Sequence, residues 1–76
     1  MREFVETITR ALVDSPDQVD VREVKNPRSV VFEVSVDGDD VGKVIGRGGK
    51  NARALRTLVT AAGAKRGIRA VLKILD

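Results

Sequence analysis

The sequence predicts an α+β fold: a two-layer single domain with a three-stranded sheet and helices on one face, in the order αββααβ. With 76 residues, the chain can form only one small core. Apolar residues recur at every second position in three segments and at helical spacing in three others. Breaks rich in Gly, Pro and Asp separate these segments. Together the patterns favour one domain over residues 1–76, with helices packed on a sheet.

The first helix is expected in "REFVETITRALV", because its apolar residues recur at helical spacing: Phe4, Val5, Ile8, Ala11 and Leu12. Pro16 should end this helix, because proline lacks a backbone donor. A strand is expected over residues 19–25. Val19 and Val21 alternate there with polar residues, but Val24 is out of phase, which indicates a bulge or an early end.

The second strand is expected in "SVVFEVSV", where one face collects Val30, Phe32, Val34 and Val36. The intervening "NPR" predicts a tight turn and an antiparallel pair. The next break is "DGDD", where Asp39 or Asp40 is placed to cap a short helix over "VGKVI". The apolar face of that helix would carry Val41, Val44 and Ile45.

A longer helix is expected from Lys50 to about Ala62, ended by Gly63 in a left-handed conformation. Its expected buried face consists of Ala52, Leu55, Leu58, Val59 and Ala62. Its opposite face carries Lys50, Arg53, Arg56, Thr57 and Thr60. The final "IRAVLKIL" alternates as a strand, with one apolar face formed by Ile68, Ala70, Leu72 and Ile74.

Composition and charge narrow the class of protein. Apolar residues make up 42% and charged residues 33%, as in folded globular domains. The start lacks the apolar stretch of a signal peptide, and no run is long enough to span a bilayer, so we expect a cytoplasmic protein without membrane contact. Residues 1–40 hold five basic and ten acidic side chains, whereas residues 41–76 hold nine and one. The second half therefore suits a polyanionic partner, although a solvated basic face is the simpler alternative.

Three glycines, Gly46, Gly48 and Gly49, lie within four positions between the two later helices. The nucleotide P-loop would need a glycine where Val44 stands and a hydroxyl residue at Asn51. The dinucleotide fingerprint also needs a glycine at position 51. A tight turn alone would usually need one glycine. The excess favours close approach of a sugar-phosphate chain, because no Cβ stands in its way. Arg47 lies inside the loop, and Lys43, Lys50 and Arg53 flank it. Each of these four side chains could neutralise one phosphate.

The segment "VIGRGGKNARAL" resembles the signature of KH domains, in which an Ile-Gly-x-x-Gly loop joins two helices and clamps about four nucleotides. The matching residues are Ile45, Gly46, Arg47, Gly48 and Gly49. The extra helix and strand at the front resemble the type II variety. Nearly all of the 76 residues are similar to the KhpA-type small KH-domain RNA-binding proteins of bacteria.

The resemblance implies a mixed sheet and a non-enzymatic protein that binds single-stranded RNA without a cofactor. Gly46 to Gly49 would hold the RNA backbone, and Lys50, Arg53 and the short helix would line one wall of the groove. Val44 and Ile45 are candidates for its floor, although burial in the core is favoured for both. The family also implies a homodimer, a heterodimer with a larger Jag-type KH protein, or both.

The residue inventory is poor in catalytic groups. The chain has no His, Cys or Tyr, so the usual nucleophiles and general bases are missing, and we expect no enzyme and no small-molecule substrate. Asp37, Asp39 and Asp40 could bind a cation, but they lack the later glutamate of a calcium loop, so a turn is favoured over a metal site. The only aromatics, Phe4 and Phe32, are expected in the core, which leaves no platform for stacking bases.

The alternative is a protein–protein adaptor module in which RNA binding is secondary. Its contact surface would be the exposed face of the last strand, with Val71 and Leu75, or the end of the long helix at residues 63–67.

Overall fold

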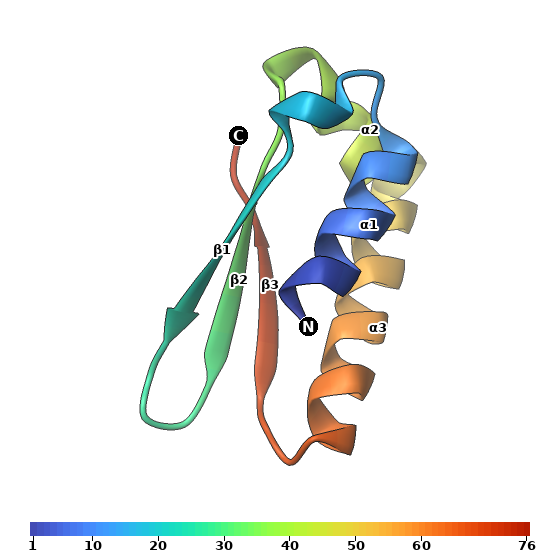
Figure 1. Ribbon diagram of the computed structural model, residues 1–76. Helices are drawn as coiled ribbons and strands as arrows, with labels where there is room; N and C mark the ends of the chain where they lie inside the picture. Colours follow the sequence, from blue (N-terminus) through green and yellow to red (C-terminus); the bar gives the residue numbers. More distant parts are fainter.

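A computed structural model, which describes residues 1–76, has the predicted order of elements (Figure 1). The helices are α1 (Arg2–Leu12), α2 (Val41–Ile45) and α3 (Lys50–Lys65), and the strands are β1 (Asp20–Lys25), β2 (Val30–Ser35) and β3 (Ala70–Ile74). All three helices lie on one face of the sheet (Figure 1). Short 3₁₀ turns precede β1, α2 and α3. None of the helices combines the length and the apolar character that a bilayer span requires.

The sheet is mixed, with β2 between the two other strands. β1 and β2 are antiparallel, from the pair Asp20 and Ser35 to the pair Lys25 and Val30. β2 and β3 are parallel, and α2 and α3 form the crossover that such a pair requires. The antiparallel hairpin and the mixed sheet are therefore confirmed.

The predicted bulge or early end at Val24 is wrong, because the register of β1 against β2 is unbroken to Lys25. Val24 pairs with Val31, and Val31 pairs with Val71 on β3. Val21 is 2% exposed and lies three residues before Val24, so Val24 belongs to the opposite face of the sheet. The irregular pattern thus marks an apolar row across the outer face, which we call the outer valine row (Val24, Val31 and Val71).

The core lies between the sheet and the helices and includes Val5, Val21, Phe32, Val34, Val44, Leu55, Val59 and Leu72. Phe4 and Leu58, both predicted to be buried, are instead 40% and 46% exposed. Each is followed by a fully buried valine, Val5 or Val59. Successive residues are about 100° apart around a helix, so only one of each pair can face the sheet.

Gly63 does not end the long helix, contrary to prediction. Helix α3 continues to Lys65, and Gly67 takes the left-handed conformation at φ 74°. The Ile68 and Gly67 amides donate to the Gly63 and Ala64 carbonyls at 2.9 and 3.0 Å, which is a Schellman cap. Gly63 is buried where α3 meets β3. A Cβ there would lie 2.7 Å from the Ala70 Cβ and 2.9 Å from the Ile68 carbonyl oxygen, so close packing requires the glycine.

Gly63→Ala should therefore lower the free energy of unfolding by about 1–3 kcal/mol, the usual effect of overpacking. Gly42→Ala is the matched control, because Gly42 is also helical and no atom lies within 4 Å of its Cβ position. The control should gain up to ~1 kcal/mol from alanine's higher helix propensity. Urea unfolding measures both, and equal stabilisation of the two variants would contradict the packing assignment.

Candidate nucleic-acid interface

The loop between α2 and α3 has glycine-specific backbone angles at three positions. Gly46, Gly48 and Gly49 have φ values of 77°, 62° and 78°. Gly48 is exposed, and Gly46 and Gly49 are half-buried. The glycines thus lie at the surface and not in the core, which leaves their main chain within reach of a ligand.

Gly46 is the most constrained of the three. With φ 77° and ψ 170° it occupies a region that is essentially restricted to glycine. A Cβ would lie 2.8 Å from the Asn51 Cγ and 2.9 Å from the Asn51 backbone nitrogen. By contrast, no atom lies within 4 Å of the Cβ position of Gly48. Gly46 therefore fixes the path of the loop, whereas Gly48 leaves open space beside it.

Asn51 connects the two helices beside the loop. Its Nδ2 donates to the Lys43 carbonyl at 2.9 Å, which ties the first turn of α3 to α2. In the sequence, Asn51 only excluded nucleotide-binding motifs, and its contact with α2 was not predicted. The available signal was an amide side chain two residues after the last glycine of the loop, a place where such side chains often bond to backbone.

Three of the predicted cations come together at the loop. Arg47 and Lys50 are exposed and take part in no ion pair. The Arg53 Nη1 donates to the Gly48 carbonyl at 2.9 Å, which holds the guanidinium against the loop. A guanidinium has five N–H donors, so others remain for a ligand.

The two floor candidates differ in exposure. Val44 is fully buried, so it cannot contact a ligand. Ile45 is 38% exposed at the entrance to the loop. Burial was favoured for both residues, and this expectation is wrong for Ile45.

The Lys43 side chain does not join the loop cations, because it is paired with two aspartates. Its Nζ lies 3.1 Å from the Asp14 Oδ2 and 3.4 Å from the Asp40 Oδ1. The hydrogen bond to Asp14 and the charges of both aspartates raise the pKa of Lys43 above its ordinary value. Its charge is therefore matched by carboxylates of the fold, and the structure does not place it with the unpaired cations of the loop.

Asp40 is 2% exposed, and its carboxylate links the segment before α2 to the segment that follows α1. Burial acts to raise the pKa of its carboxyl, but hydrogen bonds from the Ser15 and Asp14 backbone and from Lys43 hold that pKa below its ordinary value. The Asp40 Oδ2 accepts from the Ser15 amide at 3.0 Å. Asp40 occupies the N-cap position of α2, yet neither it nor Asp39 caps that helix with its side chain. The Asp37 carboxylate instead accepts from the Asp39 amide at 2.9 Å.

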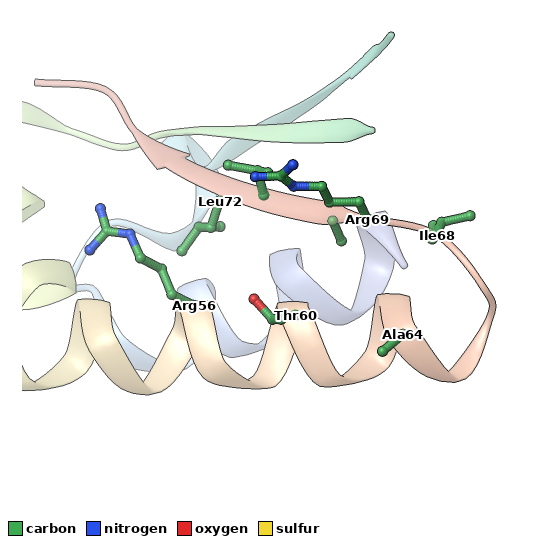
Figure 2. A pocket seen from close by; sticks show the side chains of 8 residues that line it. Arg56, Thr60, Ala64, Ile68, Arg69 and Leu72 are labelled. Carbon is green, nitrogen blue, oxygen red and sulfur yellow. The ribbon is translucent and has the colours of Figure 1, made fainter. Parts of the chain in front are cut away.

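A groove of about 470 Å³ runs between α3 and β3 (Figure 2). We call it the α3–β3 groove, and it is lined by Arg56, Thr60, Ala64, Ile68, Arg69, Ala70, Val71 and Leu72. Arg56 extends from α3, and Arg69 extends along the start of β3 (Figure 2). The sequence indicated that Arg56 and Thr60 lie away from the core but did not place them in a site. Only the packing of α3 on the sheet edge decides which of its polar residues border the groove.

The chain matches one protein family and several known relatives over nearly its whole length. A family model described as KhpA/KhpB, KH domain, matches residues 2–74. A relative from Halalkalibacterium halodurans is 49% identical over 76 residues, which cover the whole of both chains. Relatives from Caldanaerobacter subterraneus and Aquifex aeolicus are each 47% identical, over 99% and 100% of this chain and 100% and 96% of their own. All three are named RNA-binding protein KhpA. No solved structure matches the chain significantly.

The Asp40 contacts predict a pH-dependent contribution to stability. A carboxyl whose pKa is lower in the folded state than its ordinary value of 3.8 stabilises the fold when the pH is above 3.8. This stabilisation is lost as the pH falls through the pKa of the folded state. The difference in unfolding free energy between the wild type and Asp40→Asn should thus be largest near neutral pH and shrink below about pH 4. Urea unfolding between pH 7 and 3 measures it.

Asp39→Asn is the matched control, because it removes the same charge at the exposed neighbouring position. Its difference from the wild type should change much less with pH. A difference for Asp40→Asn that stays constant down to pH 3 would contradict the assigned hydrogen bonds.

Proposed function

Because this chain belongs to the KhpA/KhpB KH-domain family, we propose that it is a non-enzymatic single-stranded RNA-binding protein that holds the RNA backbone with the Gly46–Gly49 loop. The observation that carries the proposal is the surface loop of three glycines at positive φ, bordered by Arg47, Lys50 and Arg53. The names of the relatives support RNA as the ligand. An RNA ligand also agrees with the expected cytoplasmic location.

The loop would act through its bare main chain and its cations. Glycine lets a phosphate come into contact with the backbone, and the start of α3 supplies the positive end of a helix dipole. Arg47 and Lys50 can each neutralise one phosphate, and Arg53 can do so with the donors that the Gly48 carbonyl leaves free. Lys43 would act only by giving up its contacts with Asp14 and Asp40.

Bases would lie over Ile45 and in the α3–β3 groove. The groove offers apolar atoms from Ile68 and Leu72, the Thr60 hydroxyl and the Arg56 guanidinium. Phe32 is 1% exposed, and Phe4 lies in a separate hollow with Met1, Ala62, Lys65 and Arg66. Bases would therefore be held by aliphatic contacts and hydrogen bonds, which predicts weak and loosely selective binding dominated by phosphate contacts.

The double variant Arg47→Asp/Gly48→Asp tests the loop. It replaces one positive charge and adds two negative ones where the phosphates would lie, so affinity for a four-nucleotide RNA should fall at least ~10-fold. The Gly48 position is open, so the change should lower the unfolding free energy by only about 1–2 kcal/mol, the usual strain of a left-handed residue. NMR titration with the RNA and thermal unfolding measure the two effects.

The control is Arg66→Asp/Gly67→Asp. It repeats the same dipeptide and charge change at the other end of α3, and Gly67 also has a positive φ, 74°, and open space at its Cβ position. This variant should bind the four-nucleotide RNA as the wild type does. Equal affinity of both variants would contradict the loop assignment.

We further propose that a second copy or a larger Jag-type KH protein supplies the avidity that one weak domain lacks. The outer valine row supports this protein–protein role as a second candidate function, because Val71 is 39% exposed on the face of the sheet away from the helices. Leu75 is half-buried and its amide donates to the Val34 carbonyl, so it is a poorer contact. Buried Gly63 is excluded from a contact surface.

Val71→Glu tests the adaptor function. A carboxylate in the outer valine row would oppose burial against a partner, so self-association measured by sedimentation at high protein concentration should weaken at least ~10-fold. Lys73→Glu, at an exposed position two residues further on the same strand face, is the control for charge alone. Unchanged association of Val71→Glu would exclude this face as the contact.

A further inference from the structure

Unpaired arginines continue beyond the loop to the opposite end of the molecule. The four ion pairs use the acids Glu6, Glu33, Asp14 and Asp40, and their basic partners are Arg10, Arg22 and Lys43. Arg28, Arg56 and Arg69 are exposed and belong to none of these pairs. Their charges are therefore available to an anion.

Arg28 and Arg69 lie on two different connections of the chain that border one hollow. The β1–β2 turn and the α3–β3 connection lie at the same end of the molecule, opposite α2 (Figure 1). The Val30 amide donates to the Arg69 carbonyl at 2.8 Å, which fixes the turn against the start of β3. Between the two connections lies a hollow of about 410 Å³, which we call the distal hollow, lined by Asn26, Pro27, Arg28, Ser29, Val30, Gly67, Ile68 and Arg69.

The distal hollow continues the α3–β3 groove. Ile68 and Arg69 line both, so one surface leads from the groove into the hollow. Neither lining contains an acidic side chain, although the chain has 11 Asp and Glu residues. Arg56 and Arg69 lie on opposite walls of the groove, with the small side chains of Thr60 and Ala64 between them along α3 (Figure 2).

The surface from the loop to the distal hollow is longer than the four nucleotides that a KH loop clamps. The 16 residues of α3 span roughly 24 Å at about 1.5 Å per residue, from the loop at one end to Gly67 at the other. A stacked strand advances about 3.4 Å per nucleotide, so roughly seven nucleotides would cover that length. The four that a KH loop clamps would cover about half.

We propose that the distal hollow is a second phosphate-binding site for the same RNA strand, with Arg28 and Arg69 contacting nucleotides beyond those at the loop. This proposal rests on the function proposed above. Arginine suits the role, because its planar guanidinium can bond a phosphate through two N–H groups at once. The protein would thus bind longer RNA strands more tightly, because they engage both ends of the molecule, whereas short strands engage only the loop.

The test compares oligouridylates of four and ten nucleotides by fluorescence anisotropy over a series of salt concentrations. Arg28→Gln/Arg69→Gln should weaken binding of the ten-nucleotide RNA about 10-fold and reduce its salt slope by about 1.4, since each lost phosphate contact removes about 0.7 for single strands. Arg28→Gln alone should reduce the salt slope of the ten-nucleotide RNA by about 0.7 and change binding of the four-nucleotide RNA less than twofold, because Arg28 lines the distal hollow and not the α3–β3 groove. The control, Arg10→Gln/Arg22→Gln, removes two arginines that are already paired with carboxylates, so it should leave both RNAs unaffected.

Equal binding of the ten-nucleotide RNA by the wild type and Arg28→Gln/Arg69→Gln would overturn the distal site while leaving the loop function intact. Equal weakening of both RNA lengths by Arg28→Gln alone would also overturn it, because Arg28 would then act through the loop or the fold. If the wild type binds neither RNA, or the loop variant binds both normally, the proposed function itself fails. Arg28→Lys/Arg69→Lys, which keeps the charges, should retain most of the salt slope, and a complete loss in that variant would argue against phosphate contact.

Discussion

The candidate site depends on the contact between Gly46 and Asn51. Gly46 adopts a backbone conformation that is essentially restricted to glycine, and its missing Cβ leaves room for the Asn51 side chain and backbone. Asn51 in turn bonds to the Lys43 carbonyl. These two residues set the angle at which α3 leaves α2, and hence the positions of the loop cations and of the groove wall that α3 forms. Any larger side chain at position 46 would push the two helices apart.

The acidic first half of the chain, residues 1–40, supplies carboxylates that stabilise the fold, whereas most cations of the basic second half, residues 41–76, stay without ion-pair partners. Every ion pair draws its carboxylate from the first 40 residues, and Lys43 is the one cation of the second half that they neutralise. The remaining basic residues of that half lack ion-pair partners. Exposed ion pairs contribute little to stability, so leaving these cations unpaired has a small energetic cost. Among these cations, Arg56 and Arg69 line the α3–β3 groove without carboxylate partners.

The sequence predicted the order of elements, the antiparallel hairpin and the position of the glycine loop, because periodicity and chain breaks are local signals. Its errors occurred where tertiary packing decides. Phe4 and Leu58 match the apolar pattern of their helices, yet Val5 and Val59 face the sheet. Gly63 looks like a helix end but is a packing contact with β3. Lys43 lies beside the loop in sequence, and only the folded chain brings Asp14, 29 positions earlier, to its ammonium group. Arg28 and Arg69 are 41 positions apart and gave no signal of proximity.

The parallel pairing of β3 with β2 affects the order in which the parts of the candidate site can form. The β1–β2 hairpin and the helices rely on contacts close in sequence, which form fast, whereas β3 must close a long crossover before it can pair. A nascent chain that has emerged only through α3 carries the glycine loop but lacks one wall of the groove. The groove wall that β3 forms is therefore completed after the glycine loop and its flanking helices.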